Sequence, residues 1–224
     1  MAEQSTPKRS SLSPGWLLFA ALALAIPTGA LLLSRAGAPA APLPVIAELP
    51  EFKLFDEQGR PFGRGELRGR VWVADFVFTS CSDACPRLTQ KMKALQDRLL
   101  SPEQGGQISL LSISVDPDRD TPEKLRDYGQ AFGARPGLWK WATGSQGEIE
   151  RTVVQGFKMA VVRQPRVKVA GMSADQVRAE AFDIFHGEKL VLVDAQGRIR
   201  GYFDADEQDA LLRAARSLTT GGRG

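Results

Sequence analysis

Two cysteines, the only ones in the 224-residue chain, stand four positions apart in the segment FVFTSCSDACPRL. Cys81 follows an apolar run, and Cys85 directly precedes Pro86. Two thiols on one helical turn can bind a single metal ion together, and they can also close a disulfide. In an exported protein a lone pair of cysteines is by default a disulfide. The pair by itself therefore leaves three interpretations open: a structural disulfide, a redox couple and a metal site.

The elements expected around this pair place both thiols where ligands bind. The apolar run from Val71 to Phe78 predicts a buried strand, and a helix should follow from about Pro86 to Leu100. Ligands of α/β proteins bind beyond the carboxyl ends of the strands. The free N–H groups and the dipole at a helix N-terminus also favour thiolate over thiol. Both sulfurs are therefore expected to be unusually acidic.

His186 is the only histidine of the chain and lies in the segment AFDIFHGEKLVLVD. A lone histidine is more often structural than a ligand. Two thiolates and one imidazole nevertheless make a three-coordinate set that suits Cu(I), and soft thiolates favour copper over magnesium, calcium or manganese. Structural zinc would need a fourth ligand, usually another Cys or His, and the sequence has none left. His186 thus tips the balance from a disulfide toward a metal site.

Asp116 and Asp120 follow a second apolar run, 108–115, and precede a helix expected to begin at Pro122 with Thr121 as its cap. One interpretation is structural: Asp120 helps to cap this helix and Asp116 fixes a turn. The other is functional, with Asp116 orienting the site from outside the ligand set or approaching oxidised copper as a weak ligand. Both residues are therefore accessory candidates.

The remaining patterns predict a compact α/β domain. Strand, helix, strand and helix in succession indicate a parallel sheet with helical crossovers. The segment from Arg163 to Ala181 fits least well, as either a solvated loop with a short helix or a docking surface for an acidic partner. Two hairpins are expected, one over 52–62 turned at Gln58 and Gly59 and one turned at Gln196 and Gly197. A strand over 139–143 and helices over 146–155 and 206–217 are also expected. Core positions are expected for Trp139, Trp141 and Phe157.

The N-terminal part predicts export and attachment to a membrane. Residues 16–33 carry no charge, and eighteen helical residues reach about 27 Å, close to the thickness of the bilayer core. Lys8 and Arg9 in the tail 1–15 keep that tail in the cytoplasm. Residues 34–50 are rich in Pro and Ala and are interpreted as a linker. An AxA pattern at 38–40 leaves a cleaved signal peptide as the alternative.

Charge and composition exclude other classes of protein. The formal net charge is only +3, and no basic stripe with interleaved aromatic residues is visible, so no nucleic-acid partner is expected. The leading segment also lacks the Arg-rich amphipathic character of a mitochondrial transit peptide, which favours a bacterial source. The expected location is the bacterial inner membrane, crossed once, with the globular domain facing the periplasm or the cell exterior.

Three segments in this order, FTSCSDACP, SISVDPDRDTPEKLRDY and FHGEKLVLVDAQGRIRGYF, closely resemble the Sco/SenC/PrrC family of copper chaperones for cytochrome c oxidase assembly. The resemblance covers about 51–213. It implies a thioredoxin-like fold over 51–224, with a central mixed sheet flanked by helices and an N-terminal transmembrane anchor. It further implies that copper, as Cu(I) or Cu(II), is bound by Cys81, Cys85 and His186. The segment 116–122 matches a family motif that lies near the metal.

The resemblance also implies a role. Family members deliver copper to the CuA centre of cytochrome c oxidase subunit II, or reduce the cysteines of that centre before loading. The alternative is an extracytoplasmic thiol-disulfide oxidoreductase that uses Cys81 and Cys85, with their disulfide as the oxidised, metal-free state. CxxxC spacing in place of CxxC counts against this alternative. The sequence departs from the commonest family motif at Ser82, where proline is usual, and at Gly187, which is often serine.

Overall fold

The central sheet is built around strands that are buried on both faces. In the computed structural model, which describes residues 43–100, 108–159, 162–165, 182–185 and 189–220, β4 (Val71–Val77) and β5 (Ile108–Ser114) run parallel and are buried along their whole length. A third strand, β6 (Trp139–Thr143), runs parallel to β5. The apolar runs of the sequence therefore predicted the buried strands correctly, because a strand covered on both faces has no polar side.

Antiparallel strands complete a mixed sheet of order β1-β10-β9-β4-β5-β6-β2-β3. The predicted turns are confirmed at Gly59 and Gly197, which have φ of 73° and 79°, a backbone conformation that glycine adopts without strain. The antiparallel strands are β1 (Ala47–Glu48), β2 (Leu54–Asp56), β3 (Pro61–Phe62), β9 (Lys189–Val193) and β10 (Arg198–Asp204).

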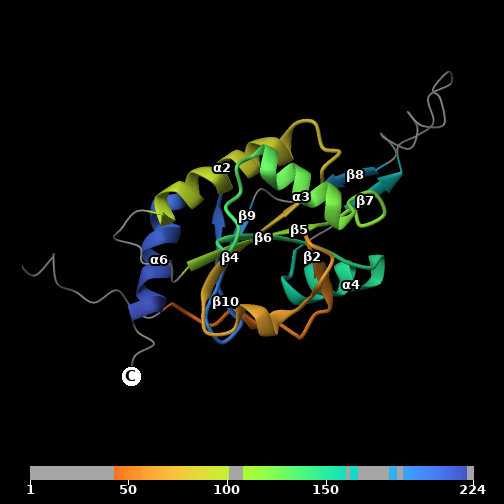
Figure 1. Cartoon of the computed structure of the whole chain (residues 1–224). Helices are drawn as coiled ribbons and strands as arrows, with labels where there is room; N and C mark the ends of the chain where they lie inside the picture. The colour runs from red at the N-terminus through yellow and green to blue at the C-terminus, as the bar shows by residue number, and fades with distance from the viewer. Residues whose placement is uncertain (1–42, 101–107, 160–161, 166–181, 186–188, 221–224) are drawn as a thin grey trace, which may run out of the picture. The chain divides into compact units, whose positions relative to one another are not determined.

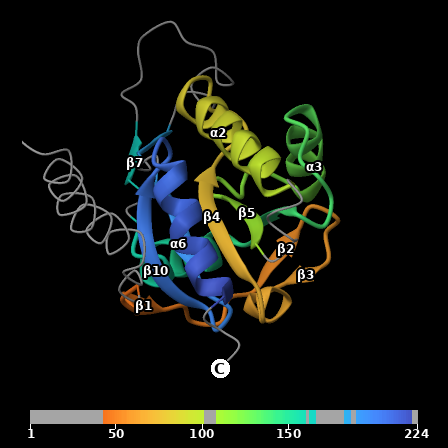
Figure 2. The same cartoon turned by 90° about the vertical axis from the view of Figure 1, so that its left-hand side faces the viewer.

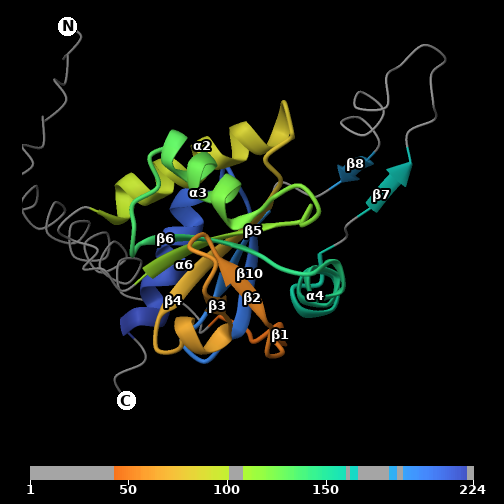
Figure 3. The ribbon, with the colours of Figure 1, turned by 45° about the vertical axis from the view of Figure 1, so that its right-hand side comes forward.

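Helices cover both faces of this sheet. Helices α2 (Ala84–Leu99) and α3 (Pro122–Ala131) lie on one side, and α4 (Gln146–Glu150) lies on the other (Figures 1 and 3). Helix α6 (Gln208–Thr220) lies beside α2 (Figure 2), where Arg98 of α2 pairs with Asp209 of α6 at 2.5 Å. The remaining turns are a 3-10 helix, η1 (Arg64–Leu67), and a π-helical turn, η3 (Arg151–Gly156), that continues α4.

The core has two parts, one on each face of the sheet. Under α2 the side chains at helical spacing are all buried, namely Leu88, Met92, Leu95 and Leu99. On the other face Phe157 makes edge-on contacts with Trp72 and Phe76, with ring centroids 5.9 and 5.0 Å apart. On the face that α3 covers, Trp139 and Trp141 stack at 5.0 Å and are also buried, and Trp141 contacts Tyr128 of α3. The predicted core positions of both tryptophans and of Phe157 are therefore confirmed.

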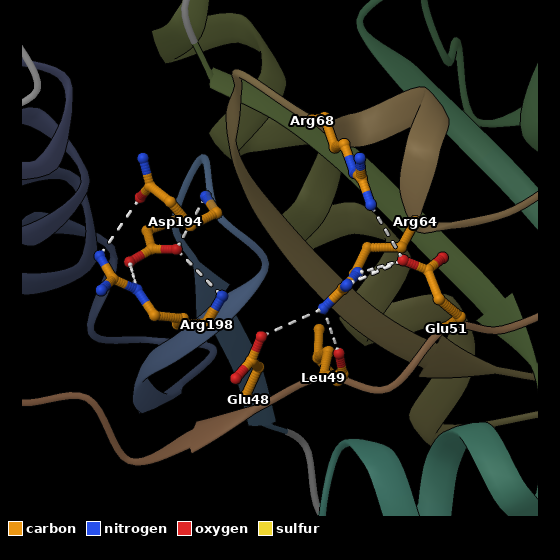
Figure 4. Close-up of polar contacts among 8 residues, drawn as sticks. Glu48, Leu49, Glu51, Arg64, Arg68, Asp194 and Arg198 are labelled. Carbon is orange, nitrogen blue, oxygen red and sulfur yellow. Dashed lines mark hydrogen bonds and ion pairs between the residues drawn. The ribbon is translucent and has the colours of Figure 1, made fainter.

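The folded part of the chain begins before Glu51. Strand β1 pairs with β10, and Leu49 is buried in the core. The Arg64 guanidinium donates to the Leu49 carbonyl oxygen and pairs with Glu51 at 2.8 Å (Figure 4), and Arg200 donates to the Pro44 carbonyl oxygen at 3.1 Å. The sheet thus begins inside the segment that the sequence analysis assigned to the linker.

Several predicted features lie outside the described residues. They are the cytoplasmic tail, the membrane span over 16–33, most of the linker, and His186 with Gly187. Among the helices that the structure describes, none is long and apolar enough to cross a membrane. Of the segment Arg163–Ala181, only its first residues are described: they belong to β7 (Val162–Pro165), which pairs antiparallel with β8 (Phe182–Phe185). Strands β7 and β8 therefore form a small second sheet.

Candidate metal centre

The two thiols meet where β4 gives way to α2. Cys81 lies in the connecting loop and is half-buried, whereas Cys85 is the second residue of α2 and is fully buried. The backbone N–H of Cys85 donates to the sulfur of Cys81 at 3.3 Å. Asp83, at the N-cap position, gives no side-chain cap, so the Cys81 sulfur satisfies a helix N–H that would otherwise have no partner in the helix. Both thiols lie at the carboxyl end of β4, as predicted.

The predicted acidity of both sulfurs is wrong for Cys85. Burial raises the pKa of this thiol far above its ordinary value, and the nearby Cys81 sulfur and Asp75 carboxyl raise it further. A backbone hydrogen bond from Phe78 acts in the opposite direction but is the weaker effect. The reason is desolvation: the helix N-terminus favours a thiolate, but Cys85 points into the apolar interior, where a charge is costly. At neutral pH this thiol therefore keeps its proton.

Asp120 is fully buried and connects the cysteine loop to the end of β5. Its carboxylate accepts hydrogen bonds from the Thr79 N–H at 3.0 Å, the Thr79 hydroxyl at 2.5 Å and the Ser114 hydroxyl at 2.6 Å. The predicted helix-capping role of Asp120 is wrong. Thr121 caps α3, as expected, by accepting from the Lys124 N–H at 3.4 Å. Asp120 instead binds Thr79 in the loop that carries Cys81.

Asp116 forms the turn that was predicted for it. Its carbonyl oxygen accepts from the N–H groups of Arg119 and Asp120, at 3.1 and 3.0 Å. Its N–H donates to the Ser114 hydroxyl, and its carboxylate pairs with Arg119 at 2.5 Å. Asp116 is 6% exposed, so this ion pair is largely shielded from solvent. Asp116 and Asp120 thus belong to one hydrogen-bonded loop at the carboxyl end of β5, next to the loop that carries Cys81.

A polar cluster that the sequence analysis did not identify lies in the buried interior near the thiols. Asp75, in the middle of β4, accepts from the Ser112 hydroxyl at 2.5 Å, and its second carboxylate oxygen is buried without a hydrogen bond. Burial raises the pKa of Asp75 to about 7. Burial also raises the pKa of Tyr128 to about 12, and the charges of Cys85 and Cys81 contribute. A single acidic residue in an apolar strand was the sequence signal that could have identified Asp75.

The third predicted ligand, His186, lies outside the described residues, between β8 and β9 along the chain. Among the residues that are described, no group of three His, Cys, Asp or Glu side chains is arranged to hold a metal ion. The structure thus brings together Cys81 and Cys85 and places Asp120 beside their loop. The role of Thr79 was not predicted, because a threonine in a loop carries no distinctive pattern.

Known proteins of similar sequence and structure are found. A protein of Bacillus subtilis described as an SCO1 protein homolog is 29% identical over 79% of this chain and 86% of its own length. The structure of BsSco, described as having a disulfide switch and as a member of the Sco family of cytochrome c oxidase assembly proteins, is 28% identical and has a TM-score of 0.64. That match covers 79% of this chain and 96% of BsSco.

A more distant structure, that of Bradyrhizobium japonicum ScoI with copper bound, has 22% identity and a TM-score of 0.61 and covers 77% of this chain and all of that one, which supports the shared fold alone. The family model described as SCO1/SenC matches residues 43–219, which includes β1 and the chain through most of α6. That match starts where the described fold starts and takes in both cysteines and His186. The chain therefore belongs to the SCO1/SenC family.

Proposed function

We propose that this protein binds copper through Cys81, Cys85 and His186 and supplies it during cytochrome c oxidase assembly. The observation that carries the proposal is the meeting of two thiols at the carboxyl end of β4, joined by the hydrogen bond from the Cys85 N–H to the Cys81 sulfur. Thiolates are soft ligands that select Cu(I) over harder ions, and a histidine completes a three-coordinate set. The assembly role stated for BsSco supports this function.

The unequal burial of the two thiols suits transfer of the metal. Cys81 is half-buried and lies in a loop, so an acceptor protein can reach its sulfur, whereas Cys85 is buried under α2. Exchange of ligands can then begin at Cys81 while Cys85 still holds the ion. We propose the CuA centre of oxidase subunit II as the recipient. We also propose that residues 16–33 hold the protein in the bacterial inner membrane with residues 43–220 outside the cytoplasm.

A copper titration tests this function. The reduced protein should take up one copper ion per chain and show sulfur-to-copper charge-transfer absorption when loaded with Cu(II). His186→Ala should weaken the affinity by about tenfold or more, and Cys85→Ser more still, because each variant removes one ligand. Lys53→Ala, a change at a residue of the loop before β2, serves as a control that should bind copper like the unaltered protein. A His186→Ala variant with full affinity would contradict the three-ligand site.

Thiol-disulfide exchange is the second candidate, and the same unequal burial favours it. The Cys81 thiolate would attack an acceptor disulfide and release one acceptor thiolate, forming a mixed disulfide. The Cys85 thiolate, after losing its proton, would then attack Cys81 and release the second acceptor thiolate. The acceptor gains two electrons, and the Cys81–Cys85 pair becomes a disulfide. His186→Ala should leave the rate of this exchange unchanged, which separates the two functions in a single variant.

A further inference from the structure

The loop that presents Cys81 is joined to a neighbouring loop through Thr79. It leaves β4 at Phe78 and enters α2 after Asp83. A turn in which the Cys81 N–H donates to the Phe78 carbonyl oxygen at 3.2 Å shapes it from within. The bonds from Thr79 to Asp120 tie it to a neighbouring element. Thr79 stands two positions before Cys81, so the orientation of Thr79 sets the direction in which the loop continues to the thiol.

Asp120 is itself rigidly held. Its N–H donates to the Asp116 carbonyl oxygen, its carboxylate also accepts from Ser114 at the end of β5, and the next residue, Thr121, caps α3. Its side chain is fully buried, and all three groups that donate to it are neutral. Hydrogen bonds to a buried carboxylate are stronger than those between neutral groups, and removing one partner leaves an unsatisfied charge. The Thr79–Asp120 link is thus a strong connection between two loops at the ends of adjacent parallel strands.

We propose that Asp120 is a positioning residue for the copper site: by binding both the N–H and the hydroxyl of Thr79, it fixes the loop that presents Cys81. This inference rests on the proposed copper-binding function. With the Thr79–Asp120 link in place, the loop holds Cys81 near Cys85 before copper arrives. Without the link, the loop also samples conformations in which Cys81 turns away from Cys85. Copper then binds only the fraction of molecules whose loop is in the right conformation, and the apparent copper affinity falls.

Variants of Thr79 test the proposal, because Thr79 is half-buried and its replacement leaves Asp120 in place. Thr79→Val keeps the shape of the side chain and removes the hydroxyl, whereas Thr79→Ser keeps the hydroxyl. Thr121→Ala is the matched control: it removes the cap of α3 next to Asp120 but leaves the Thr79 link intact. Two properties are measured for each variant, namely the copper affinity and, in the reduced copper-free protein, the rate at which iodoacetamide alkylates Cys81.

Thr79→Val should bind copper about tenfold or more weakly, since it loses a hydrogen bond to a charged group. It should also be alkylated at Cys81 at least about threefold faster, because the loop opens more often. Thr79→Ser should restore both properties, and Thr121→Ala should change neither. If Thr79→Val does not fold, Asp120→Asn, which replaces one acceptor oxygen by a donor, should give the same two changes.

Three outcomes would overturn the inference while leaving the proposed function intact. They are unaltered copper affinity in Thr79→Val, failure of Thr79→Ser to restore that affinity, and an equal loss of affinity in Thr121→Ala. If the unaltered protein takes up no copper, the proposed function fails. The alkylation rate alone then decides whether Asp120 fixes the loop that presents Cys81. Faster alkylation of Cys81 in Thr79→Val, but not in Thr121→Ala, then supports the positioning role, and equal rates reject it.

Discussion

Asp75 is predicted to make the stability of the fold fall as pH rises, and Asp75→Asn should remove that dependence. Burial raises the pKa of Asp75 to about 7, against an ordinary value of 3.8. Below pH 3.8 the carboxyl is protonated in both the folded and the unfolded chain. Between these two values the unfolded chain loses the proton and the folded chain keeps it, so unfolding becomes easier as pH rises. The loss of stability is complete above the pKa of Asp75 in the folded protein.

The magnitude follows from the gap between the two pKa values. At about 1.4 kcal/mol per pH unit, the gap between 3.8 and about 7 corresponds to about 4 kcal/mol of lost stability at pH 8. An asparagine at this position cannot ionise. Its oxygen can still accept from the Ser112 hydroxyl, and its NH2 group takes the place of the carboxylate oxygen that has no hydrogen bond. The stability of Asp75→Asn relative to the unaltered protein should therefore rise steadily from pH 4 to pH 7.

Urea unfolding of the reduced, copper-free protein at several pH values measures this difference. Asp194→Asn is the control with the opposite sign. Burial would raise the pKa of Asp194, but hydrogen bonds from Arg198 and Arg200 outweigh burial and lower it. Asp194 therefore stabilises the fold above its ordinary pKa, and this contribution is lost as pH falls through the folded value. Asp194→Asn should therefore lower the free energy of unfolding most at neutral pH. Parallel curves for the unaltered protein and Asp75→Asn would refute a buried, protonated Asp75.

Two further predictions concern packing and the start of the fold. Gly129→Ala should destabilise the protein by about 1–3 kcal/mol in urea unfolding, because a Cβ at this position would lie 2.6 Å from Trp141 Nε1. Gly147→Ala, where a Cβ would meet nothing within 4 Å, should be neutral or stabilising by up to about 1 kcal/mol. Arg200→Met should speed proteolysis just after Leu43, because it removes the hydrogen bonds to the carbonyl oxygens of Leu43 and Pro44. An unchanged rate of cleavage there would show that β1 alone holds this segment.

The sequence predicted the regular elements well wherever local patterns determine them. The apolar strands β4 and β5, the Thr121 cap with Pro122 behind it, and the turns at Gly59 and Gly197 all follow from short-range preferences. The inclusion of 43–50 in the fold was not predicted, because it depends on Arg64 and Arg200, which are distant in sequence from the carbonyls they bind. Proline-rich composition predicts only that such a segment is extended.

The positions of the two cysteines were predicted, but the electrostatics of Cys85 were not. Cys81 and Cys85 lie at the carboxyl end of β4, as the spacing indicated. The acidity expected of Cys85 failed because helix-end effects can be read from sequence, whereas the depth of burial of one side chain cannot. Asp120 was identified as an accessory residue, but its partner Thr79 lies 41 positions away. A contact between two loops brought together by adjacent strands has no local signature.

The two edges of the large sheet have a consequence for solubility. Both edge strands, β1 and β3, are only two residues long, and β3 begins with Pro61, which has no N–H to donate. A long, flat edge would offer a row of unpaired backbone groups to another chain. Here the strands with the strongest tendency to aggregate, β4 and β5, lie in the middle of the sheet, each with a neighbour on either side. The folded sheet thus gives neighbouring molecules little backbone to pair with, which protects the protein from edge-to-edge aggregation.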